Sequence, residues 1–385
     1  ESRRGPVAST PSSFRSPTAK RASRNRAGTT HGNSESKRFR VASGFDFRVF
    51  CSSLYRQEPI LKAIICQSFD HPSNLTLSET EAPTLAAHEV LIDVAATGLG
   101  YVDALTVSGL YQIKPPLPFI PGNEIAGTVI DVGADVQNLK IGDRVLAMPS
   151  NGGLAEQISL SASRCLVIPD HLRFPAAASF LVNYCTAHHG LITCGALTAT
   201  DTVLILGASG GVGVAAIDVA KSHGAHVIAA ASTPEKVQAA IKAGADEGLL
   251  YSAADWRDQL KTLLAGRALT VVYDPVGGDY ADPALRSLSP GGRYLVIGFA
   301  SGTIPKFAAN LTLLKQISIV GVNWGGHIMI HPEASQPVID HLLSRIQARQ
   351  LNPEAGQCFA LADAGQAMTA MLDRQAIGKI VITQE

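Results

Sequence analysis

The order of apolar and polar positions divides the chain into two parts of different kinds. Residues 61–187 contain short segments in which apolar and polar residues alternate, a pattern typical of half-buried strands. Residues 201–321 contain short, fully apolar runs separated by segments with helical spacing, which is typical of buried parallel strands joined by helices. The pattern therefore predicts a small, mostly β module followed by a doubly wound α/β domain.

In the first part, turn signals such as Pro121-Gly122 and Val132-Gly133 separate the strand segments, which is typical of a barrel-like module. Strands are expected there at 63–66, 89–94, 126–131, 143–146 and 155–158. In the second part, helices are expected at 234–243 and 254–264, among others. Six strands are expected there, at 203–206, 224–231, 248–251, 269–274, 291–298 and 317–321.

A glycine-rich turn, Gly207-Ala-Ser-Gly-Gly-Val-Gly213, lies between the first apolar run of the second part and a helical pattern. A strand, a bare backbone turn and a helix N-terminus in this order form a pyrophosphate site of the Rossmann type. The same residues also fit G-x-S-x-G, in which Ser209 is the nucleophile of an α/β-hydrolase. The turn alone favours neither chemistry.

The end of the next predicted strand has the sequence Ala230-Ala-Ser-Thr233, with no acidic residue. An NAD site usually places Asp or Glu there, to bind the ribose hydroxyls. A neutral end with Ser232, followed by Lys236, instead favours the 2′-phosphate of NADP(H). The alternative is structural, with Ser232 capping a helix that starts near Pro234 and Lys236 solvated.

Charge is segregated along the chain, although the formal net charge is zero and 46% of the residues are hydrophobic. Residues 1–60 contain 12 Lys and Arg against 4 Asp and Glu, whereas residues 61–385 contain 20 against 28. The second stretch is mildly acidic, so nucleic-acid binding is not expected as the main role. Apolar runs are too short to predict a membrane-spanning segment.

Residues 1–60 are rich in Ser and Arg and predict a disordered extension. Such a composition suits a mitochondrial transit peptide, but also upstream sequence without a role in the enzyme. A new β pattern starts at residue 61, which favours the second interpretation and a cytoplasmic protein.

Six cysteines are scattered without C-x-x-C or zinc-finger spacing, which suits a reducing compartment and simple core packing. His188 and His189 are adjacent, and side chains of adjacent helical residues point about 100° apart. We therefore expect no shared metal at this pair.

Short motifs, most of them with turn glycines, follow one another along residues 61–385. They are Gly98-Leu-Gly-Tyr-Val-Asp103, Gly109-Leu-Tyr111, Pro116-Leu-Pro-Phe-Ile-Pro-Gly122, Glu124-Ile-Ala-Gly127, Val132-Gly133, Gly142-Asp-Arg-Val145, Gly152-Gly-Leu-Ala-Glu156, Thr186-Ala-His-His-Gly190, the turn at 207–213, Gly244-Ala-Asp246, Asp274-Pro-Val-Gly-Gly278 and Gly378-Lys-Ile-Val381.

With these motifs in this order, the chain resembles the zinc-free NADPH:quinone oxidoreductase branch of the medium-chain dehydrogenase/reductase superfamily. The resemblance implies a GroES-like substrate domain at 61–187, completed by 325–385, and a Rossmann NADP-binding domain at 188–324. It also implies an active site in the cleft between them, and it removes the hydrolase alternative.

Zinc-dependent members of the superfamily have a Cys in the segment that corresponds to 98–103 and a Gly-His-Glu near 122–124. Here the second motif is Gly122-Asn123-Glu124, no Cys lies nearby, and the segment of the four-cysteine lobe is missing. Without a Lewis acid to polarise an alcohol, the resemblance implies hydride transfer to a conjugated acceptor, a quinone or an enone.

The resemblance also implies the site residues. Tyr111 is expected beside the nicotinamide and Tyr101 is a second candidate, although either tyrosine could instead pack inside the β domain. Gly100 stands where many relatives have Asn, so the pocket or the substrate's orientation differs. Asn323 contacts the nicotinamide or caps a helix. The remaining cofactor contacts are Asn183, Thr186, Ser209, Gly210, Gly211, Val212, Gly213, Ser232, Lys236, Tyr251, Lys379 and, at the carboxyl end of a strand, Ile297, Gly298 and Phe299.

The predicted function is NADPH-dependent reduction of a quinone or other α,β-unsaturated carbonyl compound by a homodimer. An enoyl-thioester reductase is one alternative, although no basic patch for a large acyl carrier is evident. A protein that binds NADPH without turnover is the other.

Overall fold

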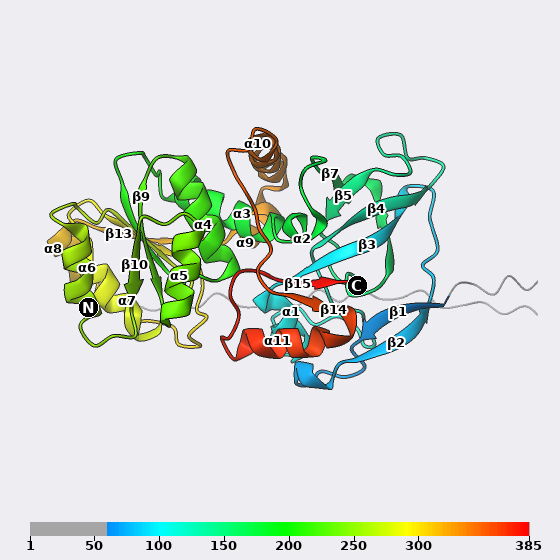
Figure 1. Ribbon diagram of the computed structural model, residues 1–385, viewed down its shortest axis with the longest axis horizontal. Coiled ribbons are helices and arrows are strands. Elements are labelled where there is room, and N and C mark those ends of the chain that lie inside the picture. Colours follow the sequence, from blue (N-terminus) through cyan, green and yellow to red (C-terminus); the bar gives the residue numbers. More distant parts are fainter. Residues whose placement is uncertain (1–59, 385) are drawn as a thin grey trace, which may run out of the picture. The chain divides into compact units, whose positions relative to one another are not determined.

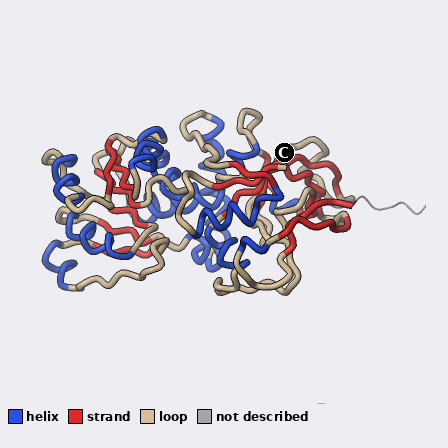
Figure 2. The backbone as a smooth tube through the Cα atoms, turned by 60° about the horizontal axis from the view of Figure 1, so that its bottom comes forward, coloured by secondary structure: helices blue, strands red, loops and turns tan. Residues whose placement is uncertain are grey.

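The computed structural model describes residues 60–384. The extension predicted over residues 1–60 and Cys51 within it lie outside the described residues, apart from residue 60. Strands gather in two groups, with helices around and between them (Figure 2). Across the described residues, no helix is long and apolar enough to cross a membrane.

Six parallel strands form one sheet in the order β10-β9-β8-β11-β12-β13. The chain begins at the centre with β8, winds outward to β10, returns to β11 beside β8 and winds the other way. Ligands bind at the carboxyl ends of the strands where such a sheet reverses direction, here between β8 and β11. The bounds agree with the predicted apolar runs and are β8 Thr202–Leu206, β9 His226–Ala231, β10 Glu247–Leu250, β11 Val271–Asp274, β12 Arg293–Val296 and β13 Ser318–Gly321.

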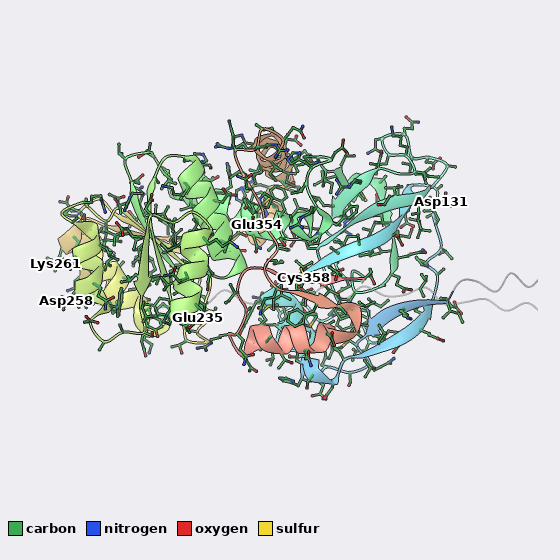
Figure 3. All side chains as sticks on the ribbon, viewed as in Figure 1. Asp131, Glu235, Asp258, Lys261, Glu354 and Cys358 are labelled. Carbon is green, nitrogen blue, oxygen red and sulfur yellow. The ribbon has the colours of Figure 1, made fainter. Side chains whose placement is uncertain are left out.

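Helices cover both faces of this sheet (Figure 1). On one face, α4 and α5 share a core with α3 and α10; on the other, α6, α7 and α8 pack together. Helix α6 buries Trp256 and Leu260 and turns Asp258 and Lys261 to solvent (Figure 3), as its spacing predicts. The bounds are α4 Gly211–Ser222, α5 Pro234–Lys242, α6 Trp256–Leu264, α7 Ala281–Ser287 and α8 Asn310–Lys315.

The other strands form a two-stranded sheet, β1-β2, and a larger sheet of order β14-β15-β3-β4-β5-β7, with β6 also paired to β3. β2, β7 and helix α1 were not predicted. Strand β2 is polar and mostly exposed, so it has no apolar alternation. The bounds are β1 Ile60–Ile65, β2 Thr76–Glu81, β3 Glu89–Leu99, α1 Tyr101–Val107, β4 Ile125–Val132, β5 Arg144–Ala147, β6 Gln157–Ser161 and β7 Cys165–Val167.

The C-terminal segment returns to the larger sheet, because β15 pairs antiparallel with β3 and β14 pairs with β15. Helices α2 and α3 and a π-helix connect the two groups of strands. The boundary predicted between residues 187 and 188 lies inside this helical run, and the domain bounds stay predictions. The bounds are α2 Phe174–Ala177, α3 Leu181–His188, the π-helix His189–Cys194, α9 Trp324–Ile330, α10 Ser335–Gln347, β14 Cys358–Ala360, α11 Ala364–Leu372 and β15 Ile380–Thr383, with 3₁₀ turns at Pro72–Asn74, Ala162–Arg164, Gly278–Tyr280, Pro332–Ala334 and Leu361–Asp363.

Candidate functional site

The glycine turn joins the end of β8 to the N-terminus of α4. Gly207 has a φ of +59°, and a Cβ at Gly213 would lie 2.5 Å from the Gly207 carbonyl oxygen, so the turn requires glycine at both positions. Gly210 is the N-cap, and Gly211, Val212 and Gly213 form the first turn of the helix. The first N–H groups of a helix have no intrahelical acceptor, so this end offers donors and a partial positive charge to an anion.

Two segments that are distant in sequence lie against this turn. Asn183, buried in α3, faces Gly211, where a Cβ would lie 2.7 Å from the Asn183 amide nitrogen. The Gly378 N–H donates to the Ser209 carbonyl oxygen at 2.6 Å. Thr186 is half-buried one turn after Asn183 in α3. The C-terminal segment and α3 therefore hold the turn from the side of the larger sheet.

Basic side chains gather near the carboxyl ends of β9 and β10. The Lys236 ammonium donates a hydrogen bond to the Arg374 carbonyl oxygen. The Arg374 guanidinium in turn donates to the Ser301 carbonyl oxygen at 2.7 Å. Burial, with Arg374 nearby, lowers the pKa of Lys236. Burial raises the pKa of Tyr251, and a hydrogen bond with the Ser232 side chain opposes this rise. Ser232 and Tyr251 therefore lie side by side, and Lys236 follows in the first turn of α5, whereas the 2′-phosphate site stays a prediction.

The alternative roles for these two residues, Ser232 as a helix cap and Lys236 as a solvated lysine, were wrong. The cap of α5 is Thr233, whose hydroxyl accepts from the Lys236 N–H at 3.3 Å, so Ser232 does not cap this helix. Lys236 is half-buried and bonded to a carbonyl rather than solvated.

At the carboxyl end of β12, Ile297 and Gly298 are half-buried and Phe299 is exposed. The N–H of Ile297 donates to the Asp274 carbonyl at 2.9 Å, which fixes this end against β11. Asn323 caps α9 by accepting from the Gly326 N–H at 2.9 Å. Asn323 therefore caps a helix, which is one of the two roles that the sequence left open for it.

The two candidate tyrosines lie at either end of one short segment. Tyr101 begins α1 and is 38% exposed, so the alternative that it packs inside the β domain is wrong. Tyr111 is half-buried in the loop after α1, where its N–H donates to the Leu105 carbonyl at 3.2 Å. Within the described part of the chain, the hydroxyl groups of Tyr101 and Tyr111 form no hydrogen bond with another side chain.

Three buried ionisable groups lie at the start of α1 or next to it. The Lys379 ammonium donates to Glu124 Oε2 at 2.9 Å, and both side chains are buried. The Asp103 carboxylate accepts from the Gly100 N–H at 2.7 Å. Burial raises the pKa of Asp103 to about 6, although the Gly100 hydrogen bond and the Lys379 ammonium oppose the rise. We call Asp103, Glu124 and Lys379 the buried ion cluster.

The raised pKa of Asp103 predicts a stability that depends on pH. Because its pKa lies above the ordinary 3.8, Asp103 contributes stability that is complete below about pH 4 and is lost as the pH rises through 6. Asp103→Asn removes this loss while keeping an oxygen for the Gly100 N–H. Relative to wild type, the variant should gain roughly 2 kcal/mol of unfolding free energy between pH 4.5 and 7.5 in urea titrations. Asp93→Asn, on exposed Asp93 of β3, is the control, and an equal gain there would refute the prediction.

His188 and His189 lie in separate clusters. The His188 ring contacts His341, whereas the His189 ring contacts Trp324 and His327. Within residues 60–384, no group of three His, Cys, Asp or Glu side chains could hold a metal ion.

Comparisons with known proteins agree with this geometry. Residues 86–170 match a family model described as an alcohol dehydrogenase GroES-like domain, and residues 211–344 match one described as a zinc-binding dehydrogenase. The chain is 34% identical over 323 residues to quinone oxidoreductase-like protein 2 of Bos taurus, which covers 84% of this chain and 92% of that protein. The chain belongs to the quinone oxidoreductase family of medium-chain dehydrogenases/reductases. It is thus an oxidoreductase of that superfamily.

Solved structures of this family have the same fold. A probable oxidoreductase from Mycobacterium abscessus aligns with a TM-score of 0.75 at 31% identity, covering 84% of this chain and 99% of that chain. The quinone oxidoreductase of Thermus thermophilus, whose structures include a complex with NADPH, aligns with a TM-score of 0.70 at 31% identity and the same coverage.

The zinc in the second model's description does not fit the residues present. Asn123 stands between Gly122 and Glu124, where zinc-dependent members have His, and the Lys379 ammonium already binds Glu124. An ammonium in that position repels a metal cation.

Sequence reasoning missed Arg374, which lies in the returning C-terminal segment, 138 positions from Lys236, where no local pattern marks it. Gly378, Asp103 and Glu124 were part of matched motifs but were given no role. For Asp103, an acid among buried positions of a short helix was the available signal.

Proposed function

We propose that this oxidoreductase uses NADPH to reduce a quinone or another α,β-unsaturated carbonyl compound without a metal. The observation that supports it most is the glycine turn together with the cluster of Ser232, Lys236 and Arg374 at the end of β9, where an acidic residue is lacking. The N–H groups at the helix N-terminus favour a pyrophosphate, and the basic side chains of the cluster favour a second, doubly charged phosphate. The NADPH complex of the Thermus thermophilus relative supports the same cofactor.

When bound, NADPH supplies the hydride. The residues of this chain orient the two reactants and stabilise the charge that arrives on the acceptor. Asn183 and Thr186 are proposed to position the nicotinamide end, since α3 lies beside the turn. Tyr111 and Tyr101 are proposed to donate hydrogen bonds to the carbonyl oxygen, because their hydroxyls are not otherwise engaged within residues 60–384 and phenols are good proton donors.

NADPH oxidation, followed by the absorbance of the reduced nicotinamide with a panel of quinones, enones and enoyl thioesters, tests the proposal. Turnover of quinones or enones, with NADPH preferred over NADH, is the expected result. Preference for enoyl thioesters would assign the chain to that class of reductase instead. NADPH binding without turnover of any acceptor would indicate a binding protein of the same fold.

A homodimer is proposed through the edge strand β13. Its outer side is not paired in the described sheet, and Ile319 on it and Leu313, Leu314, Met329 and Ile330 nearby are exposed. An open apolar edge of this kind pairs readily with a second copy by a two-fold axis. Light scattering after size exclusion should give a dimer mass, and Ile319→Lys should shift it to the monomer. A wild-type monomer at micromolar concentration would refute the proposal.

A further inference from the structure

Lys379 has more hydrogen-bond donors than the protein gives it acceptors. An ammonium has three N–H donors, and the only hydrogen bond of this one within residues 60–384 goes to Glu124. The side chain is 5% exposed, and buried donors are normally satisfied. Two N–H groups are therefore left for a ligand atom or water.

Gly100, which is half-buried, adjoins this ammonium. A Cβ at Gly100 would lie 3.4 Å from Asp103 Oδ2 and 4.0 Å from Lys379 Nζ. Because Gly100 has no side chain, the position of that Cβ is empty beside both polar groups. Gly100 also immediately precedes Tyr101, so the ammonium lies beside the segment that holds both candidate tyrosines.

The ammonium is held in place from three distant segments. Glu124 binds it through Oε2 and accepts from the Val182 N–H through Oε1 at 3.3 Å, and the Glu124 carbonyl accepts from the Gly98 N–H at 2.8 Å. Asp103 adds a second carboxyl group nearby. A donor fixed in a water-poor site stabilises developing negative charge far better than a mobile one does.

We propose that Lys379 is a catalytic residue whose ammonium donates a hydrogen bond to the carbonyl oxygen of the acceptor, through the space at Gly100. This rests on the proposed reductase function. The acceptor gains a hydride from NADPH and a proton from solvent, NADPH is oxidised to NADP⁺, and the ammonium stabilises the negative charge on the oxygen before the proton arrives.

The first test compares turnover with cofactor binding. Lys379→Met combined with Glu124→Gln removes both charges of the ion pair, so Glu124 does not stay buried as an unpaired carboxylate. We expect kcat to fall about 100-fold, as for loss of one oxyanion donor, with the Kd for NADPH changed less than about twofold. A parallel rise in the NADPH Kd would overturn the proposal, because Lys379 would then be a cofactor contact.

A second variant keeps the ion cluster intact. Gly100→Leu fills the space above Lys379 at a position whose φ of −105° accepts any residue. It should lower kcat/KM about tenfold or more without changing the NADPH Kd. Gly325→Leu, on an exposed glycine whose Cβ would meet only Asn323 at 3.9 Å, is the matched control. Equal activity of the two leucine variants would contradict the proposal.

A third measurement does not depend on turnover. The ionised form of 4-nitrophenol absorbs visible light and presents an oxyanion on a flat conjugated ring. In the presence of NADP⁺, it should bind wild type at least about tenfold more tightly than the double variant. Equal affinities would overturn the role of Lys379. If wild type binds the probe tightly but reduces no acceptor, the reductase function fails and the oxyanion contact stands.

Discussion

Gly98→Ala is expected to cost at least about 3 kcal/mol of unfolding free energy and to leave little folded protein at 37 °C. A Cβ at Gly98 would lie 1.8 Å from the Ala178 carbonyl oxygen and 3.0 Å from the Lys379 side chain. The first contact is with backbone at the end of α2, so no rotamer change relieves it. The strand is also fixed, because the Gly98 N–H donates to Glu124 and Gly98 pairs with Val381.

Chemical denaturation of Gly98→Ala and Gly325→Ala measures this effect. The control adds the same methyl group to a glycine of α9 with free space around it, and alanine is the better helix former. A loss below about 1 kcal/mol for Gly98→Ala would mean that α2 moves away from β3 more easily than close packing allows.

The parallel sheet could be predicted from the sequence because each of its strands is buried on both faces. β8 is Thr-Val-Leu-Ile-Leu and is buried throughout, so the apolar run coincides with the strand. Glycine turns and helical spacing then mark the ends. The strand order was not predicted, and the right-handed crossovers of such units do not fix it by themselves.

The part of the chain outside the parallel sheet was predicted less completely, because some of its elements are polar or short. The strand β2 has the sequence Thr-Leu-Ser-Glu-Thr-Glu and exposes most of it, and α1 is seven residues long with Val102 and Val107 in a sequence that also suits a strand. Pairing with β1 and packing against α11 decide these segments, and neither contact is visible in a local window.

The candidate site was predicted where its parts adjoin in sequence and missed where they do not. The turn at 207–213 is continuous and could be interpreted directly. Lys379 and Glu124 are 255 positions apart, so their ion pair depends on the return of β15 to β3. After β9, either Ser232 or Thr233 could cap the helix. The choice depends on the residue at which the helical backbone begins, and the cap propensities of Ser and Thr are too similar to predict it.

Lys236→Glu is expected to lower kcat/KM for NADPH about 100-fold and to change that for NADH by less than about threefold. Lys236 is half-buried beside Ser232 and Arg374, so its charge is poorly screened and its reversal would repel a 2′-phosphate. NADH lacks that phosphate, so its binding is not affected by the change.

Lys242→Glu makes the same charge change at the exposed end of the same helix α5, and it should leave the ratio of kcat/KM for NADPH to kcat/KM for NADH unaltered. Steady-state kinetics with both cofactors and one acceptor measure the ratio. An equal loss for NADH and NADPH would show that Lys236 supports the fold of this edge, through its bond to the Arg374 carbonyl, and does not select the phosphate.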